Sequence, residues 1–189
     1  MLRVLVLLAV VCSVQAEIRY VSTMGDNGNT GAEGDPWRDI QFGADQLQPG
    51  DELRVLAGTY AEKVVLGPTH AGISLVTESA IIDGGSLTPI GREGLITLSG
   101  ASDVTIRGFT LENFSTADGV EINDTPVGIL IIGSGSSISI RDNVIRGIAN
   151  RSTCGQSSGC GLGAKTDRHP KIDRSCKYCC FLNANLIFF

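Results

Sequence analysis

Two short stretches of the chain carry an arginine within the same apolar pattern. DVTIRGFTLEN, residues 103–113, contains Arg107, and SISIRDNVIRG, residues 137–147, contains Arg141. If both stretches are stacked strands, the two guanidinium groups lie side by side and could form a cationic rung for an acidic polymer. Both arginines could instead form ion pairs on a solvated face. The acidic residues near them in sequence are Asp103, Glu112 and Asp142.

An acidic segment between two apolar runs could bind a divalent cation. STADGVEIND, residues 115–124, contains Asp118, Glu121 and Asp124, whose carboxylates are the oxygen ligands that calcium prefers. The spacing of these residues does not match a known calcium loop. A calcium site and a plain solvated loop therefore both remain open.

Lys63 is the one lysine between residues 17 and 150, and so the one lysine there that could remove a proton from a substrate. Nothing in the surrounding TYAEKVVL would perturb its pKa, so a solvated strand residue is expected. The chain shows no Ser-His-Asp set, no phosphate-binding loop and no basic patch for nucleic acid.

The cysteines of the chain lie near its two ends. Cys154 and Cys160 could close a small disulfide loop in an oxidising compartment. Cys176 and Cys179 have zinc-like spacing, but a second ligand pair is missing, so we expect no zinc site.

The N-terminal segment, from Met1 to Ala16, has the form of a secretory signal. Arg3 precedes an apolar run, and Val14-Gln15-Ala16 ends it with a small residue, which predicts cleavage after Ala16 and a secreted chain. The apolar run is too short to span a bilayer, although an uncleaved anchor is the alternative. Export agrees with three glycosylation sequons. These sequons begin at Asn113, Asn123 and Asn150.

Charge changes abruptly near residue 150. Residues 17–150 hold 8 Lys and Arg against 18 Asp and Glu, whereas residues 151–189 hold 6 against 2. The acidic first part argues against nucleic acid and anionic membranes as partners. Residues 164–189 lack both strand alternation and helical period, so we predict an atypical disordered tail, foreign to the fold.

The matching stretches predict an all-β solenoid over residues 17–163. Val104 aligns with Ile138, Ile106 with Ile140 and Leu111 with Ile145, and the spacing is the same in all three pairs. Gly108-Phe109 and Asp142-Asn143 fall at the same place, where a strand would bend. Earlier segments match more weakly and at unequal spacings, with Leu53 aligned to Ile73 and Ile73 to Val104. Repeats of this length indicate stacked units, here a parallel β-helix of about four coils. Gly is abundant, at 24 of 189 residues, and aromatic residues are few. The alternative is an antiparallel sandwich, which the lack of Asn-Gly hairpin signals between strands disfavours.

A short amphipathic helix is expected to cap the first coil. Asp35 can cap a helix and Pro36 suits its first position. Helical spacing of the apolar residues then predicts a helix that ends at Pro49-Gly50, with Trp37 packed in the core rather than stacked on a sugar. These apolar residues are Trp37, Ile40, Ala44 and Leu47.

Residues 20–60 resemble the opening of secreted right-handed parallel β-helix proteins of the pectate-lyase-like superfamily, which includes chondroitinase-B-type polysaccharide lyases. The shared pieces are a strand, a Gly/Asp/Asn loop, a Pro-Trp cap, then PGD, a strand and GTY. The resemblance covers about residues 18–163 and implies a right-handed parallel β-helix with a capping α-helix. Such proteins usually have more coils, so the solenoid is expected to be incomplete at its C-terminus.

The same resemblance implies carbohydrate chemistry. It points to the N-terminal part of a lyase that cleaves acidic polysaccharide by β-elimination, where a Lys or Arg base removes a proton beside a carboxylate that calcium often neutralises. Because the fold also hosts non-catalytic proteins, a glycan-binding or structural protein and an inactive fragment are the alternatives. We expect a monomer with calcium as the one candidate cofactor and little lyase activity in this chain.

Overall fold

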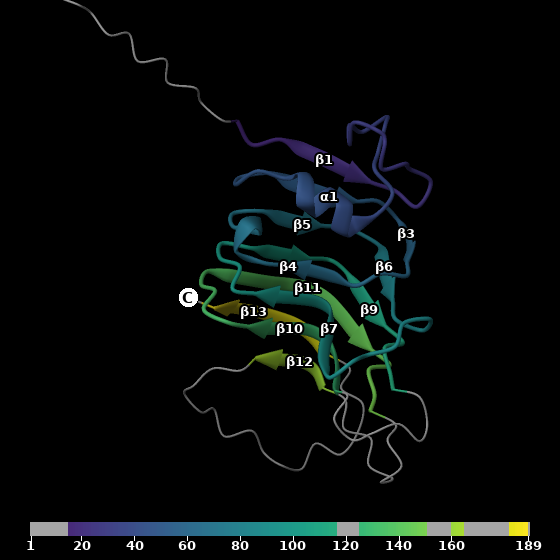
Figure 1. Ribbon diagram of the computed structural model, residues 1–189, viewed down its shortest axis with the longest axis vertical. Coiled ribbons are helices and arrows are strands. Elements are labelled where there is room, and N and C mark those ends of the chain that lie inside the picture. Colours follow the sequence, from purple (N-terminus) through teal and green to yellow (C-terminus); the bar gives the residue numbers. More distant parts are fainter. Residues whose placement is uncertain (1–14, 117–124, 151–159, 165–181, 189) are drawn as a thin grey trace, which may run out of the picture.

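The chain winds into four stacked coils, and each coil contributes a strand to each of three parallel stacks (Figure 1). A computed structural model describes residues 15–116, 125–150, 160–164 and 182–188. The predicted fold class, an all-β parallel β-helix with a short capping helix, is confirmed. The first stack is β1 (Ile18–Val21), β2 (Glu52–Val55), β5 (Ser74–Val76), β8 (Thr105–Arg107) and the first half of β11 (Ile138–Arg146). The second is β3 (Gly58–Tyr60), β6 (Ala80–Asp83), β9 (Thr110–Glu112) and the second half of β11. The third is β4 (Val64–Leu66), β7 (Arg92–Ser99), β10 (Thr125–Ile132) and β12 (Cys160–Ala164).

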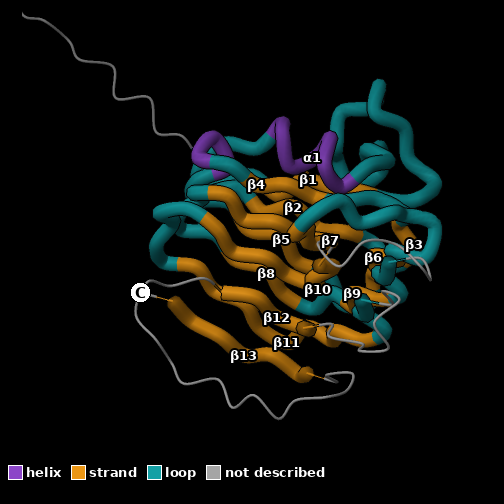
Figure 2. Tube along the Cα trace, turned by 60° about the horizontal axis from the view of Figure 1, so that its bottom comes forward, coloured by secondary structure: helices purple, strands orange, loops and turns teal. Residues whose placement is uncertain are grey.

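Aliphatic side chains form continuous columns between the stacks. Alternation along each strand directs every second residue inward, and parallel pairing then sets inward residues of successive coils above one another. Ile106 pairs with Ile140 and Leu111 with Ile145, as the sequence repeat predicts, and all four are fully buried. Burial of each such side chain stabilises the fold by about 1.5–3 kcal/mol. Figure 2 shows the stacked strands of successive coils with the lower end of the solenoid turned toward the viewer.

The register of the first two coils differs from the sequence prediction. The repeat aligned Leu53 with Ile73, whereas Leu53 pairs with Leu75. A shift of two positions keeps every inward side chain inward, so alternation cannot distinguish the two registers. Along this column the coils run from Leu53 to Leu75, from Leu75 to Ile106 and from Ile106 to Ile140, so each coil is longer than the one before it.

A stack of left-handed turns precedes the first strand of every coil. Gly50, Gly72, Asp103 and Ser137 have φ values of 101°, 80°, 56° and 55°. Backbone hydrogen bonds join the turns, from the N–H of Gly50 to the carbonyl of Gly72 and from the N–H of Gly72 to the carbonyl of Ser102. Only glycine adopts this conformation without strain, so two coils carry a local cost.

The cap helix covers the first coil but begins later than predicted. Helix α1 (Ile40–Gln46) has Asp39 at its N-cap, not Asp35. Trp37 is extended because its backbone N–H and C=O pair with Tyr20 and Ser22. The prediction that Trp37 packs in the core is confirmed, since it is 6% exposed and its ring N–H donates to the carbonyl of Asn29.

Strand β13 (Leu182–Phe188) falls within the segment predicted as an atypical tail. It pairs antiparallel with β11, with Leu186 opposite Ile140. This is the one antiparallel strand pair among the strands that the structure describes. Most of the predicted tail, residues 165–181, lies outside the described residues.

Candidate functional site

Three arginines and a valine lie in register on the outer face of the first stack. Arg54 pairs with Val76, Val76 with Arg107 and Arg107 with Arg141, along β2, β5, β8 and β11. We call these four residues the outward row. They face solvent because their neighbours Leu53, Leu75, Ile106 and Ile140 fill the core column. The predicted adjacency of Arg107 and Arg141 is confirmed, and successive strands of a sheet lie about 4.8 Å apart.

A hollow of about 510 Å³ opens over this face, and we call it the groove. Arg54 and Arg107 line it, with Val76, Leu56 and Ala57 as its apolar surface. Three carboxylates also line the groove, two of them from loops. These are Glu33, Glu52 and Glu78.

The loop between β5 and β6 forms one rim of the groove. The hydroxyl of Thr77 accepts hydrogen bonds from the N–H groups of Ser79 and Ala80, at 3.2 and 2.9 Å. The turn below is held close, because a Cβ added to Gly108 would lie 1.9 Å from the carbonyl oxygen of Thr77. These contacts fix the loop that carries the exposed Glu78.

The two arginines of the groove differ in their ionic partners. Arg54 donates to the carboxylate of Glu52 at 2.7 Å, and this hydrogen bond raises the pKa of Arg54 above its ordinary value. Arg107 has no carboxylate within ion-pair distance among the described residues. Glu112, one of its proposed partners, pairs with Arg146 instead, at 2.5 Å. Arg107 therefore presents an exposed guanidinium that an incoming anion can bind.

Arg141 continues the outward row below the groove. Its Nε donates to the hydroxyl of Ser139 at 2.6 Å, which orients the side chain along the strand. It does not line the groove itself. A polymer leaving the groove along the first stack would meet Arg141 next.

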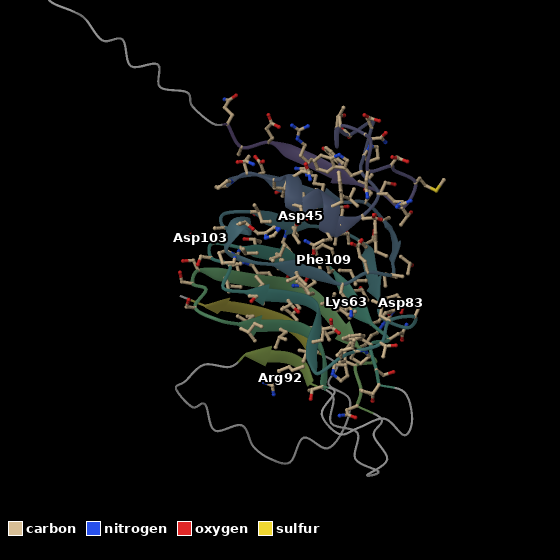
Figure 3. The ribbon with its side chains drawn as sticks, in the orientation of Figure 1. Asp45, Lys63, Asp83, Arg92, Asp103 and Phe109 are labelled. Carbon is tan, nitrogen blue, oxygen red and sulfur yellow. The ribbon has the colours of Figure 1, made fainter. Side chains whose placement is uncertain are left out.

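Lys63 lies apart from the arginines, immediately before β4 of the third stack (Figure 3). Its ammonium donates to Glu93 at 2.8 Å, and the two side chains are 28% and 29% exposed. Lys63 is thus an ion-paired, half-buried residue rather than the fully solvated one expected from the sequence.

Several predicted site residues lie outside the described residues. The proposed calcium ligands Asp118, Glu121 and Asp124 fall in residues 117–124, as does the sequon residue Asn123. Cys154 also falls outside, so its pairing with Cys160 stays a prediction. Within the described ranges no three His, Cys, Asp or Glu side chains form a metal-binding group.

The two described sequon residues differ in exposure. Asn113 is exposed at the end of β9. Asn150 is 5% exposed, and its amide oxygen accepts a hydrogen bond from the hydroxyl of Thr116 at 3.3 Å. A glycan would fit readily on Asn113, whereas Asn150 would first have to leave its packing.

Sequence reasoning missed Arg54 and the groove. The error of two positions in the first register placed Arg54 beside Ser74 rather than Val76, and so removed it from the outward row. The signal that could have found it is the apolar-Arg pattern that Leu53-Arg54 shares with Ile106-Arg107.

The described part of the chain thus defines a parallel β-helix with a mixed-charge groove on one face. No helix in that part is long and apolar enough to cross a bilayer. No family model matches the chain. It is 30% identical over 149 residues to the uncharacterized protein YwoF of Bacillus subtilis (strain 168), covering 74% of this chain and 31% of that protein.

Two solved structures are similar to the chain. A rhamnogalacturonan lyase matches with a TM-score of 0.58 and 15% identity, over 68% of this chain and 35% of that one. The lacto-N-biosidase of Eubacterium ramulus matches with a TM-score of 0.45 and 17% identity, over 67% and 27% of the two chains. The chain therefore spans about a third of the length of the proteins to which it is similar.

Proposed function

We propose that the protein is a secreted carbohydrate-active β-helix protein, the N-terminal part of a pectate-lyase-like polysaccharide lyase, whose groove binds acidic polysaccharide. The observation that carries this proposal is the exposed guanidinium of Arg107, which has no ion-pair partner among the described residues and lies in a groove beside Arg54. The similarity in fold to a rhamnogalacturonan lyase supports it.

The groove suits a sugar acid in size and charge. Its volume of about 510 Å³ lies within the range common for ligand sites. A carboxylate can accept two parallel hydrogen bonds from one guanidinium, which fixes its orientation as well as its position. Val76 and Leu56 offer an apolar surface to a sugar ring, while Glu33 and Glu78 can accept hydrogen bonds from its hydroxyl groups.

β-Elimination needs a neutralised carboxylate and a base beside it. Arg107 can neutralise the carboxylate. Lys63 is paired with Glu93 and lies at the start of another stack, so it does not supply the base at the groove. We therefore place the base outside the described residues, with Asp118, Glu121 and Asp124 as proposed oxygen ligands for calcium.

The paired state of Lys63 favours a second candidate function, a non-catalytic glycan-binding protein. Such a protein would use the same groove and need no base. Release of unsaturated sugar, followed by ultraviolet absorbance, separates the two functions.

Titration with polygalacturonate and with a neutral galactan tests the proposal. We expect binding of the acidic polymer alone. Replacing Arg107 by Ala should weaken it about 10- to 100-fold, the worth of hydrogen bonds to a charged group, and Arg107→Lys should weaken it less.

Arg92→Ala is the matched control. Arg92 is also exposed, but it lies on β7 of the third stack, so its loss removes the same charge without touching the groove. Equal weakening by both substitutions, or equal binding of both polymers, would contradict the proposal.

A further inference from the structure

A buried carboxylate lies against the backbone nitrogen of residue 17. Asp51 is 6% exposed, and its Oδ1 accepts a hydrogen bond from the N–H of Glu17 at 2.8 Å. Its Oδ2 accepts another from the N–H of Gln48, also at 2.8 Å. The carboxylate thus bridges the start of β1 and the turn before β2.

Asp51 has no cationic partner in the chain as described. Buried carboxylates are rarely found without a paired charge, because the loss of hydration is costly. No Lys, Arg or His among the described residues forms an ion pair with Asp51. Its two oxygens accept from neutral backbone N–H donors instead, so a charge partner is missing from an otherwise complete site.

The predicted leader ends at the residue before this contact. Gln15, Ala16 and Glu17 are all exposed, so a peptidase could reach the bond between Ala16 and Glu17. Hydrolysis adds the OH of water to the Ala16 carbonyl and its hydrogen to the Glu17 nitrogen. At neutral pH that nitrogen takes a further proton and becomes an α-ammonium group.

We propose that Asp51 is the binding site for the α-ammonium group of Glu17 that leader cleavage creates, so that processing converts a hydrogen bond from a neutral amide into an ion pair. This inference rests on the secretion in the proposed function. The missing positive charge of the Asp51 site is then supplied by the mature chain itself.

The surroundings can accept the new charge. A hollow of about 340 Å³ beside the contact has room for water to bind the two remaining N–H groups of the ammonium. Besides Asp51, the charged side chains lining it are Glu17 and Arg19, which form an ion pair with each other. Glu52, next to Asp51 on β2, is paired with Arg54.

The ion pair would lock β1 onto the solenoid. The N–H of Glu52 donates to the carbonyl of Glu17 at 2.9 Å, so a fixed Glu17 holds the first rung of the β1–β2 ladder. The precursor has only the hydrogen bond from the neutral Glu17 amide. Cleavage would therefore stabilise the end coil after export.

Three forms of the protein test the inference: the chain beginning at Glu17, the same chain with an acetylated N-terminus, and one retaining Gln15-Ala16. At pH 7 the free form should have a folding equilibrium constant about tenfold larger than the other two, and the pKa of its amine should be raised by about one pH unit above that of a peptide. A raised amine pKa gives stability that is full below the ordinary value of about 8 and is lost as pH rises through the folded value.

Substitutions separate this ion pair from a general effect of the N-terminus. Asp51→Asn keeps an oxygen acceptor and should abolish the difference among the three forms. Asp83→Asn is the control, because Asp83 also accepts a backbone hydrogen bond, from Gly85, but at another corner of the solenoid. It should leave the difference unchanged.

Two results would overturn the inference. One is an unshifted amine pKa in the wild-type chain, which is measurable by carbon-13 NMR after reductive methylation even if Asp51→Asn fails to fold. The other is mass spectrometry of exported protein showing an N-terminus other than Glu17. Neither measurement involves a glycan, so failure of the groove proposal would leave this result intact.

Discussion

Asn143 is a fully buried polar residue at the bend of β11. Its amide oxygen accepts from the N–H of Phe109 at 2.9 Å, and its amide nitrogen donates to the carbonyl of Ile106 at 2.9 Å. The side chain thus satisfies two backbone groups of the coil above, where β8 gives way to β9. The sequence predicts this bend, because Asp142-Asn143 aligns with Gly108-Phe109, but it does not predict both of the hydrogen bonds that Asn143 makes.

Replacing Asn143 by Ala should lower the free energy of unfolding by about 2 to 4 kcal/mol, because two buried backbone groups lose their partners. Urea denaturation measures the change. Arg141→Ala, close by on the same strand and exposed, is the control and should stay within about 0.5 kcal/mol. An equal effect of the two substitutions would show that the buried bonds contribute little.

At the scale of elements, helix α1 is capped by a carboxylate from far along the chain. Both oxygens of Glu62 accept from the first turn of the helix, from the N–H of Ile40 at 2.8 Å and of Gln41 at 3.0 Å. Asp39 at the N-cap makes no capping bond and pairs with Arg38. Burial raises the pKa of Glu62, while the hydrogen bond from Arg38 lowers the pKa of Asp39.

These two carboxyls should give stability curves of opposite slope. A raised pKa means that the folded state holds its proton more tightly, so the stability of wild type relative to Glu62→Gln should fall as pH rises above the ordinary 4.5. For Asp39, stability relative to Asp39→Asn should be lost as pH falls below 3.8. Urea denaturation across the acidic and neutral pH range checks both, and slopes of the same sign would refute the assignment.

The late start of α1 shows why an element boundary escaped prediction. The apolar spacing of Trp37, Ile40, Ala44 and Leu47 fits one helix, and only the last three belong to it or its cap. Trp37 does not join the helix because its backbone groups pair with the β1 region. A local sequence pattern does not report such a contact between separate segments. Glu62 escaped for the same reason, since it lies far along the chain from Ile40.

At the scale of the whole molecule, stacking was predictable where the sequence of one coil repeats in the next. The columns through β8 and β11 follow from the matching stretches around Ile106 and Ile140. The pairing of β2 with β5 did not follow, because the first coil is shorter than the next and alternation tolerates a shift of two positions. The groove depends on that register, because Arg54 and Val76 both line it. The sequence therefore did not predict the groove.

The turn stack running through every coil predicts a pair of opposite substitutions. Ser137→Gly should raise the free energy of unfolding by about 0.5 to 1 kcal/mol, because glycine relieves the left-handed strain. Gly72→Ala should lower it, since an added Cβ would also lie 3.1 Å from Pro49. Thermal unfolding of both variants measures the changes. Changes of the same sign would contradict a shared backbone requirement.

The unequal coils differ most at one corner. The connection from β3 to β4 takes only residues 61–63, that from β6 to β7 takes 84–91, and that from β9 to β10 takes 113–124. The strands that follow this corner nonetheless keep their pairing, since Ile96 of β7 pairs with both Val64 of β4 and Ile129 of β10. Insertions and deletions at this corner can therefore accumulate during evolution without disturbing the layers, so related chains can diverge in outline while their interiors stay superimposable.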